Sequence, residues 1–206
     1  MNADKSEWII AHRGLWADVA EQNTRLALIN ALNQGFGVET DLREHFGKLV
    51  ISHDPPVDCS SIFFEKIWSK RRFAYNIKSD GLGKYFQQII HYMKDTNSFV
   101  FDGSIPEMLK YRQYGVPHAL RLSEFEKDLP WPTEFIWIDG FREDWWLRDH
   151  EVLSHLEDKH LVFVSPELHG RDHKFAFDWF IQLRERGYAN FSVCTDYPLE
   201  LRGLCD

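Results

Sequence analysis

Ionisable side chains follow three short apolar runs in the first quarter of the sequence. The runs end at His12-Arg13-Gly14, at Glu39-Thr40-Asp41 and at His53-Asp54. Two histidines can exchange a proton near neutral pH, two carboxylates can hold a divalent cation, and an arginine can make a forked contact to phosphate. These residue types favour metal-assisted phosphoryl chemistry, provided that the three runs end side by side.

Glu39 and Asp41 stand two positions apart in a run that reads as a β-strand. Their side chains therefore point to one face, while those of Val38 and Leu42 point to the other. Two neighbouring carboxylates repel each other unless a cation lies between them. Mg²⁺ or Ca²⁺ fits better than zinc, because no histidine or cysteine nearby has the spacing of paired zinc ligands. The alternative interpretation is two surface carboxylates on an edge hairpin.

Short β-rich runs recur along the whole chain and alternate with segments that read as helices, which predicts a parallel sheet. The run from Leu49 to His53 is the exception, because residues 44–48 are too few for a crossover helix and suit an antiparallel hairpin. Eight strands remain, beginning at Trp8, Gly37, Phe73, Ser98, His118, Glu134, Leu161 and Ala189. We expect one α/β domain over residues 1–206, a compact (β/α)8 barrel with a small hairpin insertion after the second strand.

Capping residues and apolar spacing predict three helices, over Asn23–Gly35, Ser104–Gly115 and Asp172–Gly187. Each predicted helix stops at a glycine, which can take the left-handed backbone conformation that ends a helix. A chain of 206 residues is short for an eight-stranded barrel of this kind. We therefore expect some helices to be short or absent, above all around residues 123–132.

Composition narrows the class of protein. With 24 basic and 32 acidic residues the formal charge is −8, which argues against nucleic acid as a partner. The sequence has neither the long apolar stretch of a membrane span nor a hydrophobic signal segment at its start, so we expect a cytoplasmic protein without stable membrane insertion. Three widely spaced cysteines, Cys59, Cys194 and Cys205, indicate neither a disulfide framework nor a zinc site.

Almost every predicted strand ends in an ionisable or amide residue. In a (β/α)8 barrel the active site lies at the carboxyl ends of the strands, so such residues would gather at one mouth. A single one could be a cap or a satisfied core group, but a whole set favours a site. The set is His12, Arg13, Glu39, Asp41, Asn76, Lys78, Asp102, Arg121, Asp139, Glu167 and Asp196.

Four motifs resemble the N-terminal signature of the glycerophosphodiester phosphodiesterase family. They are Ala11-His12-Arg13-Gly14, Glu21-Gln22-Asn23-Thr24, Gly37-Val38-Glu39-Thr40-Asp41 and Ser52-His53-Asp54. Near the other end, Cys194-Thr195-Asp196-Tyr197-Pro198 is similar to the Thr-Asp-x-Pro that closes the last strand in that family. The resemblance spans nearly the full chain and implies a TIM barrel. It also implies that His12 and His53 act as the general acid and base, that Glu39 and Asp41 bind a metal, and that Arg13 holds phosphate.

The chain departs from the family pattern at two positions. Gln22 stands where the family has a site glutamate, and Asn76-Ile77-Lys78 stands where the family has Glu-x-Lys. Asn76 can still bind Mg²⁺ or Ca²⁺ through its amide oxygen, but it supplies no charge. The cation would therefore be held more weakly unless another group compensates, while Lys78 remains available for phosphate.

From these residues and the resemblance we expect a metal-dependent phosphodiester hydrolase. Its substrate would be a glycerophosphodiester-like or sugar-phosphodiester small molecule, and two histidines would supply acid and base catalysis. One divalent cation, Mg²⁺ or Ca²⁺, would lie at Glu39, Asp41 and Asn76. Contacts to phosphate or to the rest of the substrate would come from Arg13, Lys78, Arg121 and Glu167.

Two alternatives stay open at this point. Gln22 and Asn76, standing in place of glutamates, suit a noncatalytic barrel that binds phosphate esters. A lyase is the other alternative, in which a hydroxyl of the substrate attacks and a cyclic phosphate forms. A metal-independent form of that lyase would use Arg13 or Lys78 in place of the cation. The sequence leaves the oligomeric state open.

Overall fold

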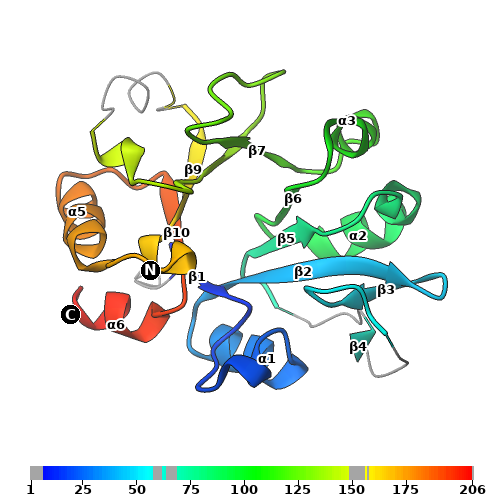
Figure 1. Cartoon of the computed structure of the whole chain (residues 1–206), viewed down its shortest axis with the longest axis horizontal. Coiled ribbons are helices and arrows are strands. Elements are labelled where there is room, and N and C mark those ends of the chain that lie inside the picture. Colours follow the sequence, from blue (N-terminus) through cyan, green and yellow to red (C-terminus); the bar gives the residue numbers. More distant parts are fainter. Residues whose placement is uncertain (1–6, 58–61, 64–68, 149–155, 157, 206) are drawn as a thin grey trace.

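Eight parallel strands form a nearly closed barrel in the computed structural model, which describes residues 7–57, 62–63, 69–148, 156 and 158–205 (Figure 1). Strand β10 pairs with β1, and β6 meets β7 through an isolated bridge between Val100 and His118. Each strand begins within two residues of its predicted start, so the (β/α)8 barrel is confirmed. The barrel strands are β1 (Ile9–His12), β2 (Gly37–His45), β5 (Phe73–Ile77), β6 (Phe99–Phe101), β7 (Ala119–Leu122), β8 (Phe135–Ile138), β9 (His160–Val164) and β10 (Phe191–Thr195).

The predicted hairpin is also confirmed. Strand β3 (Lys48–Ile51) returns antiparallel to β2, and His45 pairs with Lys48 across a two-residue turn. Both turn residues, Phe46 and Gly47, have positive φ angles of 47° and 74°, as a tight hairpin turn requires. A short strand, β4 (Ile62–Phe63), which the sequence did not predict, extends the hairpin by pairing with β3.

Helices lie around the outside of the strands (Figure 1). The predicted stops at Gly35, Gly115 and Gly187 are confirmed, with φ angles of 89°, 68° and 91°. Residues 123–134, between β7 and β8, contain no helix, as expected from the chain length. The described helices are α1 (Arg25–Asn33), α2 (Phe86–Met93), α3 (Ile105–Gln113), α5 (Lys174–Glu185) and α6 (Pro198–Gly203), with short 3₁₀ turns η1 (Val19–Glu21), η2 (Leu82–Tyr85), η3 (Trp145–Leu147) and η4 (Pro166–His169).

Two predicted helix starts are wrong by one residue. The N-cap of α1 is Thr24, whose side chain accepts a hydrogen bond from the backbone of Ala27, and the N-cap of α5 is His173. Asn23 instead has a φ angle of 60°, and its side chain is buried. This left-handed backbone, which asparagine tolerates better than most residues, turns the Asn23 side chain away from the helix and towards β2.

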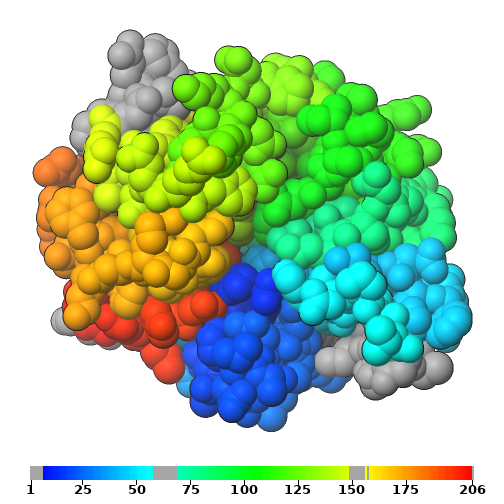
Figure 2. All heavy atoms as spheres, viewed as in Figure 1, coloured from blue at the N-terminus to red at the C-terminus, as the bar shows by residue number. Residues whose placement is uncertain are grey.

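The side chains of each barrel strand alternate between two apolar layers. One set packs inside the barrel, and the larger set packs between the strands and the helices. In Figure 2, segments from the N-terminal (blue), middle (green) and C-terminal (yellow to orange) parts of the chain meet near the centre of one face. The inner layer consists of Ile10, Ala74, Phe99, Phe101, Ala119, Phe135, Trp137, Val162, Val164 and Cys194.

The same alternation turns the polar residues at the strand ends inwards. His12 comes two residues after Ile10, and Asp139 two residues after Trp137. A residue two places further along a strand shares the face of its predecessor. The apolar inner layer therefore gives way to a polar layer at the carboxyl end of the barrel.

Two further features of the described chain bear on its class. No described helix is both long and apolar enough to span a lipid bilayer. Cys194 and Cys205 are free thiols, while Cys59 lies outside the described residues.

Candidate active site at the barrel mouth

A pocket of about 230 Å³ lies at the carboxyl ends of the barrel strands. Eight of the eleven strand-end residues expected at the site line it together, which are His12, Arg13, Glu39, Asn76, Lys78, Asp102, Arg121 and Asp139. Apolar side chains of Phe101, Trp137, Val164 and Leu168 form part of its wall. The pocket therefore combines charged groups from several strands with a surface suited to a carbon skeleton.

His12 forms a pair with Asp196 at this mouth. Its Nδ1 atom lies 2.7 Å from Oδ1 of Asp196, and its Nε2 atom lies 3.9 Å from Oε2 of Glu39. Asp196 directly follows β10, which pairs in parallel with β1, so barrel closure builds the contact. An aspartate that holds one ring nitrogen fixes the orientation of the ring, which leaves Nε2 of His12 for proton transfer.

The turn after β1 places Arg13 over the mouth. Arg13 has a φ angle of 56°, and its carbonyl accepts a hydrogen bond from the backbone of Asn23. Gly14 follows with a φ angle of 91°, and a Cβ atom there would lie 2.6 Å from the carbonyl carbon of Ala27. Only glycine fits this approach, which explains the third residue of the His-Arg-Gly motif.

Asp41 is fully buried beneath the pocket and is already paired with two cations. Oδ2 of Asp41 lies 3.1 Å from Nε of Arg13, and Oδ1 lies 3.3 Å from Nζ of Lys78. Asn23 donates its amide to Oδ2 at 2.8 Å and accepts a hydrogen bond from the hydroxyl of Thr40. Asp41 thus fixes the side chains of Arg13 and Lys78, the two candidates for phosphate binding. The hydrogen bond from Asn23 in turn fixes the Asp41 carboxylate.

Gln22, which stands where the family has a glutamate, contacts Arg13. Its side-chain oxygen accepts a hydrogen bond from Arg13 at 3.0 Å. A neutral acceptor keeps the guanidinium oriented without cancelling its charge. The replacement is therefore compatible with a positively charged Arg13 facing an anionic substrate.

Glu39 is buried, with 2% of its surface exposed. Burial, with a further contribution from Asp41, raises the pKa of Glu39 to about 7, although His12, Arg13 and Lys78 act in the opposite direction. The backbone N–H of Arg13 donates to Oε2 of Glu39 at 3.2 Å. A cation beside Glu39 would favour the charged form of this carboxyl, against the effect of burial.

Glu39, Asp41 and Asn76 together form what we call the oxygen cluster. The strand register pairs Asp41 with Asn76, and Glu39 shares their face. Oδ1 of Asp41 and Oδ1 of Asn76 are buried and accept no hydrogen bond within the described chain. Oxygen ligands of this kind fit Mg²⁺ or Ca²⁺. The cluster holds only two carboxylates, and no group of three His, Cys, Asp or Glu side chains in the described residues could hold a metal.

Arg121 approaches the pocket from the opposite side of the mouth. Its NH1 atom lies 3.0 Å from Oδ1 of Asp102, its Nε donates to Glu126, and its guanidinium lies 5.1 Å from the ring centre of Phe141. Burial raises the pKa of Asp102, which Arg121 and Lys78 partly offset. These contacts fix a positive charge across the pocket from Arg13.

Two predicted site residues lie elsewhere. His53 does not line the pocket; it is 45% exposed, and its ring contacts Asp54, which is 88% exposed, at 2.9 Å. The carboxylate of Glu167 accepts hydrogen bonds from Ser165, Thr195 and the backbone of Asp196. Glu167 therefore supports the partner of His12 rather than facing the pocket, and the roles expected of both residues stay predictions.

The sequence places Asp139 at a strand end of the site and His169 in a strand-end loop, but it does not predict that these two residues pair. Asp139 and His169 both line the pocket, and Oδ1 of Asp139 lies 2.7 Å from Nε2 of His169. The sequence signals were present, since Asp139 ends a predicted strand and His169 lies in the loop after another. Neither signal reveals the pairing, because the two residues lie 30 positions apart.

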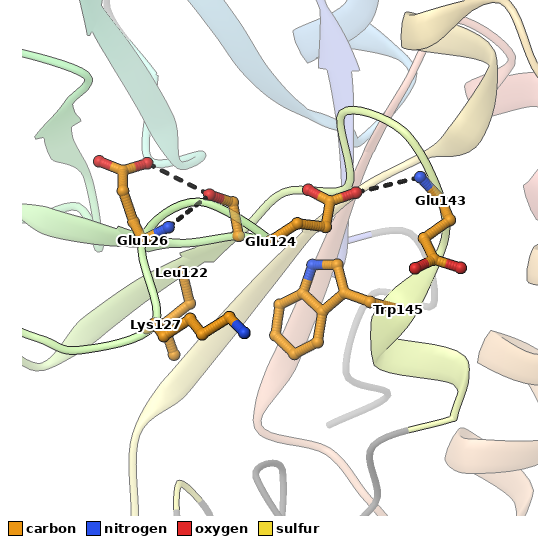
Figure 3. A pocket seen from close by; sticks show the side chains of 7 residues that line it. Leu122, Glu124, Glu126, Lys127, Glu143 and Trp145 are labelled. Atoms are coloured by element: carbon orange, nitrogen blue, oxygen red, sulfur yellow. Dashed lines mark hydrogen bonds between the residues drawn. The ribbon is translucent and has the colours of Figure 1, made fainter.

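A second cavity, of about 270 Å³, lies beside the end of β7 where the barrel lacks a helix (Figure 3). Glu124 reaches across it and accepts hydrogen bonds from the backbones of Phe141, Arg142 and Glu143. Burial works against ionisation, but these bonds lower the pKa of Glu124 below its usual value. The cavity wall thus braces the loop that places Phe141 at the mouth.

Comparison with known proteins shows that the fold of this chain is similar to that of a solved structure. A crystal structure of glycerophosphodiester phosphodiesterase from Agrobacterium tumefaciens str. C58 matches with a TM-score of 0.71, covering 95% of this chain and 97% of that one. The sequences are 16% identical, so this likeness shows the barrel fold alone. No protein-family model matches the sequence, and neither does any curated protein.

Proposed function

We propose that this chain is a phosphodiester hydrolase with His12 as its general base. The observation that carries the proposal is the His12–Asp196 pair, which opens onto a pocket that also holds Arg13, Lys78 and Arg121. A phosphodiester is an anion, and three cationic side chains around one small pocket would bind it. The likeness of the fold to a glycerophosphodiester phosphodiesterase supports the same class of reaction.

In the proposed reaction Asp196 holds the Nδ1 proton of His12, so that the lone pair of Nε2 faces the pocket. Nε2 takes the proton from the attacking oxygen as that oxygen bonds to phosphorus. Arg13 and Lys78 stabilise the negative charge that grows on the non-bridging oxygens. A divalent cation held by the oxygen cluster would add further neutralisation of this charge.

We propose a small glycerophosphodiester-like or sugar-phosphodiester substrate. The pocket of about 230 Å³ is below the range of about 300–1,000 Å³ that is typical of sites for drug-sized ligands. Phe101, Trp137 and Leu168 offer apolar surface to the carbon skeleton of one alcohol. The charged rim would hold the phosphate and the hydroxyl groups.

A metal-independent lyase is a second candidate, and the ion pairs of Asp41 favour it. Arg13 and Lys78 already lie within 3.3 Å of Asp41, so two fixed positive charges flank the pocket without any added ion. In that reaction a hydroxyl of the substrate attacks phosphorus, His12 takes its proton, and a cyclic phosphate is the first product.

Phosphorus NMR of the products tests the proposal. Purified protein would be incubated with a panel of phosphodiesters in the presence of Mg²⁺, of Ca²⁺ or of a chelator. We expect phosphomonoester products with Mg²⁺ or Ca²⁺. A cyclic phosphate formed in the chelator instead would support the lyase.

His12→Gln is the variant that links the activity to the site. Loss of a general base lowers turnover by about 10²–10⁴-fold. His91→Gln, on the exposed face of α2, serves as the matched control and should leave turnover unchanged. Wild-type protein that converts no diester under any of the three conditions would refute the proposal.

A further inference from the structure

A second histidine–aspartate pair faces the same pocket as His12. Nε2 of His169 lies 2.7 Å from Oδ1 of Asp139, and both residues line the pocket. The Asp139 side chain is 7% exposed and that of His169 is 24% exposed, so the carboxylate is buried while the ring reaches the mouth. Asp139 follows β8, three strands round the barrel from β1.

The chain holds this pair in place from several directions. The backbone N–H of Asp139 donates to Leu122 at 2.9 Å, and its carbonyl accepts the indole N–H of Trp145 at 2.7 Å. His169 ends the η4 turn, which Gly170 closes with a φ angle of 73°. The ring of Phe141 packs edge-on against the ring of His169 at 5.2 Å. A fixed imidazole beside a buried carboxylate is arranged for proton transfer.

The two pairs expose different ring nitrogens. Asp196 holds Nδ1 of His12 and leaves Nε2 for chemistry, whereas Asp139 holds Nε2 of His169 and leaves Nδ1. Displacement at phosphorus requires the attacking and leaving oxygens on opposite sides. Two imidazoles that approach one pocket from separated strands can serve these two oxygens, one as base and one as acid.

Among the described residues that line the pocket, His12 and His169 are the histidines. His53, the second histidine expected from the sequence, contacts an exposed aspartate outside the lining. His169 is therefore the second histidine that lines the pocket in the described chain.

We propose that His169 is the general acid of the phosphodiester cleavage, with Asp139 as its positioning residue; this inference rests on the proposed hydrolase function. The attacking water oxygen forms a bond to phosphorus and gives its proton to Nε2 of His12. The bond from phosphorus to the leaving oxygen breaks, and its electron pair stays on that oxygen. The leaving oxygen takes the proton from Nδ1 of protonated His169, and both histidines return to their starting states by proton exchange with water.

Leaving-group dependence tests this assignment, because a general acid matters only to a leaving group that needs a proton. Two diesters of glycerol phosphate would be compared, one that releases 4-nitrophenol and one that releases a simple alkyl alcohol. For His169→Gln we expect turnover of the alkyl diester to fall by about 10²–10⁴-fold, with turnover of the nitrophenyl diester nearly retained. His12→Gln should lower both, because a general base is needed whichever alcohol leaves.

Retained activity on the nitrophenyl diester also shows that the variant is folded. Asp139→Asn should give the same selective loss at smaller magnitude, because His169 remains but its ring is no longer held by a charge. His53→Gln tests the rival general acid and should show no selectivity between the two diesters. His91→Gln, on the exposed face of α2, is the control and should turn over both diesters as wild type does.

Three outcomes would overturn the inference. They are an equal loss on both diesters in His169→Gln, no loss on either, or selective loss in His53→Gln. In these cases wild-type turnover persists, so the hydrolase proposal stands while the assignment of His169 fails. A wild-type protein that turns over neither diester would overturn both.

Discussion

Nδ1 of His12 lies 2.7 Å from Oδ1 of Asp196, although the two residues stand 184 positions apart in the chain. Parallel pairing of β1 with β10 sets Ala11 beside Thr195, which brings the next residue of each strand together at the mouth. The carboxylate of Glu167 does not contact His12, but it accepts a hydrogen bond from the backbone N–H of Asp196 at 3.1 Å. Closure of the barrel therefore creates the proposed catalytic pair.

Replacing Asp196 with asparagine tests this pair. Asp196→Asn keeps the size of the side chain but removes the carboxylate that holds Nδ1 of His12. We expect kcat to fall by about 10²–10⁴-fold with a much smaller change in KM, measured by steady-state kinetics on a turned-over diester. Asp178→Asn, on the exposed face of α5, should leave kcat unchanged. Equal kinetics for the two variants would contradict the role of Asp196.

Replacing Asn76 with aspartate tests the oxygen cluster. Asn76→Asp adds a third carboxylate beside Glu39 and Asp41, and the affinity of calcium and magnesium sites rises with ligand charge. We expect Mg²⁺ or Ca²⁺ to bind about tenfold more tightly, about 1.4 kcal/mol, as measured by titration calorimetry. The cation-free variant should also unfold at a lower temperature than wild type, because like charges are buried together, and the cation should restore its stability.

Asn76→Leu is the matched control for this experiment. It preserves the branching of the side chain at Cγ but removes the buried oxygen that accepts no hydrogen bond in the described chain. Weaker cation binding in Asn76→Leu and tighter binding in Asn76→Asp would support a ligand at this position. Unchanged affinity in both variants would place the cation elsewhere.

A polar cluster at the other end of the barrel makes stability depend on pH. NH1 of Arg72 lies 2.5 Å from Nε2 of His160 and 2.5 Å from Oγ of Ser192, while Nδ1 of His160 faces Asn190 at 3.0 Å. Burial and the charge of Arg72 lower the pKa of His160 from 6.5 to about 3. Burial also lowers the pKa of Arg72 to about 10. His160 is therefore neutral in the folded protein at any pH well above 3.

The sign of this effect follows from proton binding. Between about pH 6.5 and pH 3 the unfolded chain protonates His160 and the folded chain does not, so the free energy of unfolding falls as the pH falls. The contribution of His160 is up to about 1.4 kcal/mol per pH unit. His160→Gln, which keeps an oxygen acceptor for Arg72, should flatten the dependence measured by urea unfolding at a series of pH values. His91→Gln should keep the wild-type slope.

Trp146 is expected to stabilise the fold rather than to contact substrate. It is fully buried, and its ring lies 5.2 Å from Phe163, 5.1 Å from Trp179 and 5.2 Å from Phe180. Trp146→Ala should lower the free energy of unfolding by about 3–5 kcal/mol, measured by urea unfolding. Trp146→Phe should cost less, because it fills much of the space and removes an indole N–H that has no hydrogen-bond partner within the described chain. A loss of activity without a loss of stability in Trp146→Ala would contradict this role.

The strands, the hairpin and the helix ends follow from local sequence. Short continuous apolar runs define the barrel strands because both faces of each strand are buried. Gly35, Gly115 and Gly187 end helices because their backbones can take positive φ angles. The turn at Phe46-Gly47 is likewise a short-range feature. Local sequence failed at Asn23 because Asn and Thr are both good caps, and a long-range contact to Asp41 decided between them.

The sequence by itself determined which residue types would gather at the barrel mouth, because strand ends of a parallel barrel share one edge and the alternation of side chains sets the face. Only the tertiary structure decided which of them pair. Asp196 reaches His12 and Asp139 reaches His169 through strands that are distant in the chain, and Asp41 is enclosed by Arg13 and Lys78. Such pairings depend on how the strands close into a barrel and how each loop folds over its end, and no spacing along the chain encodes them.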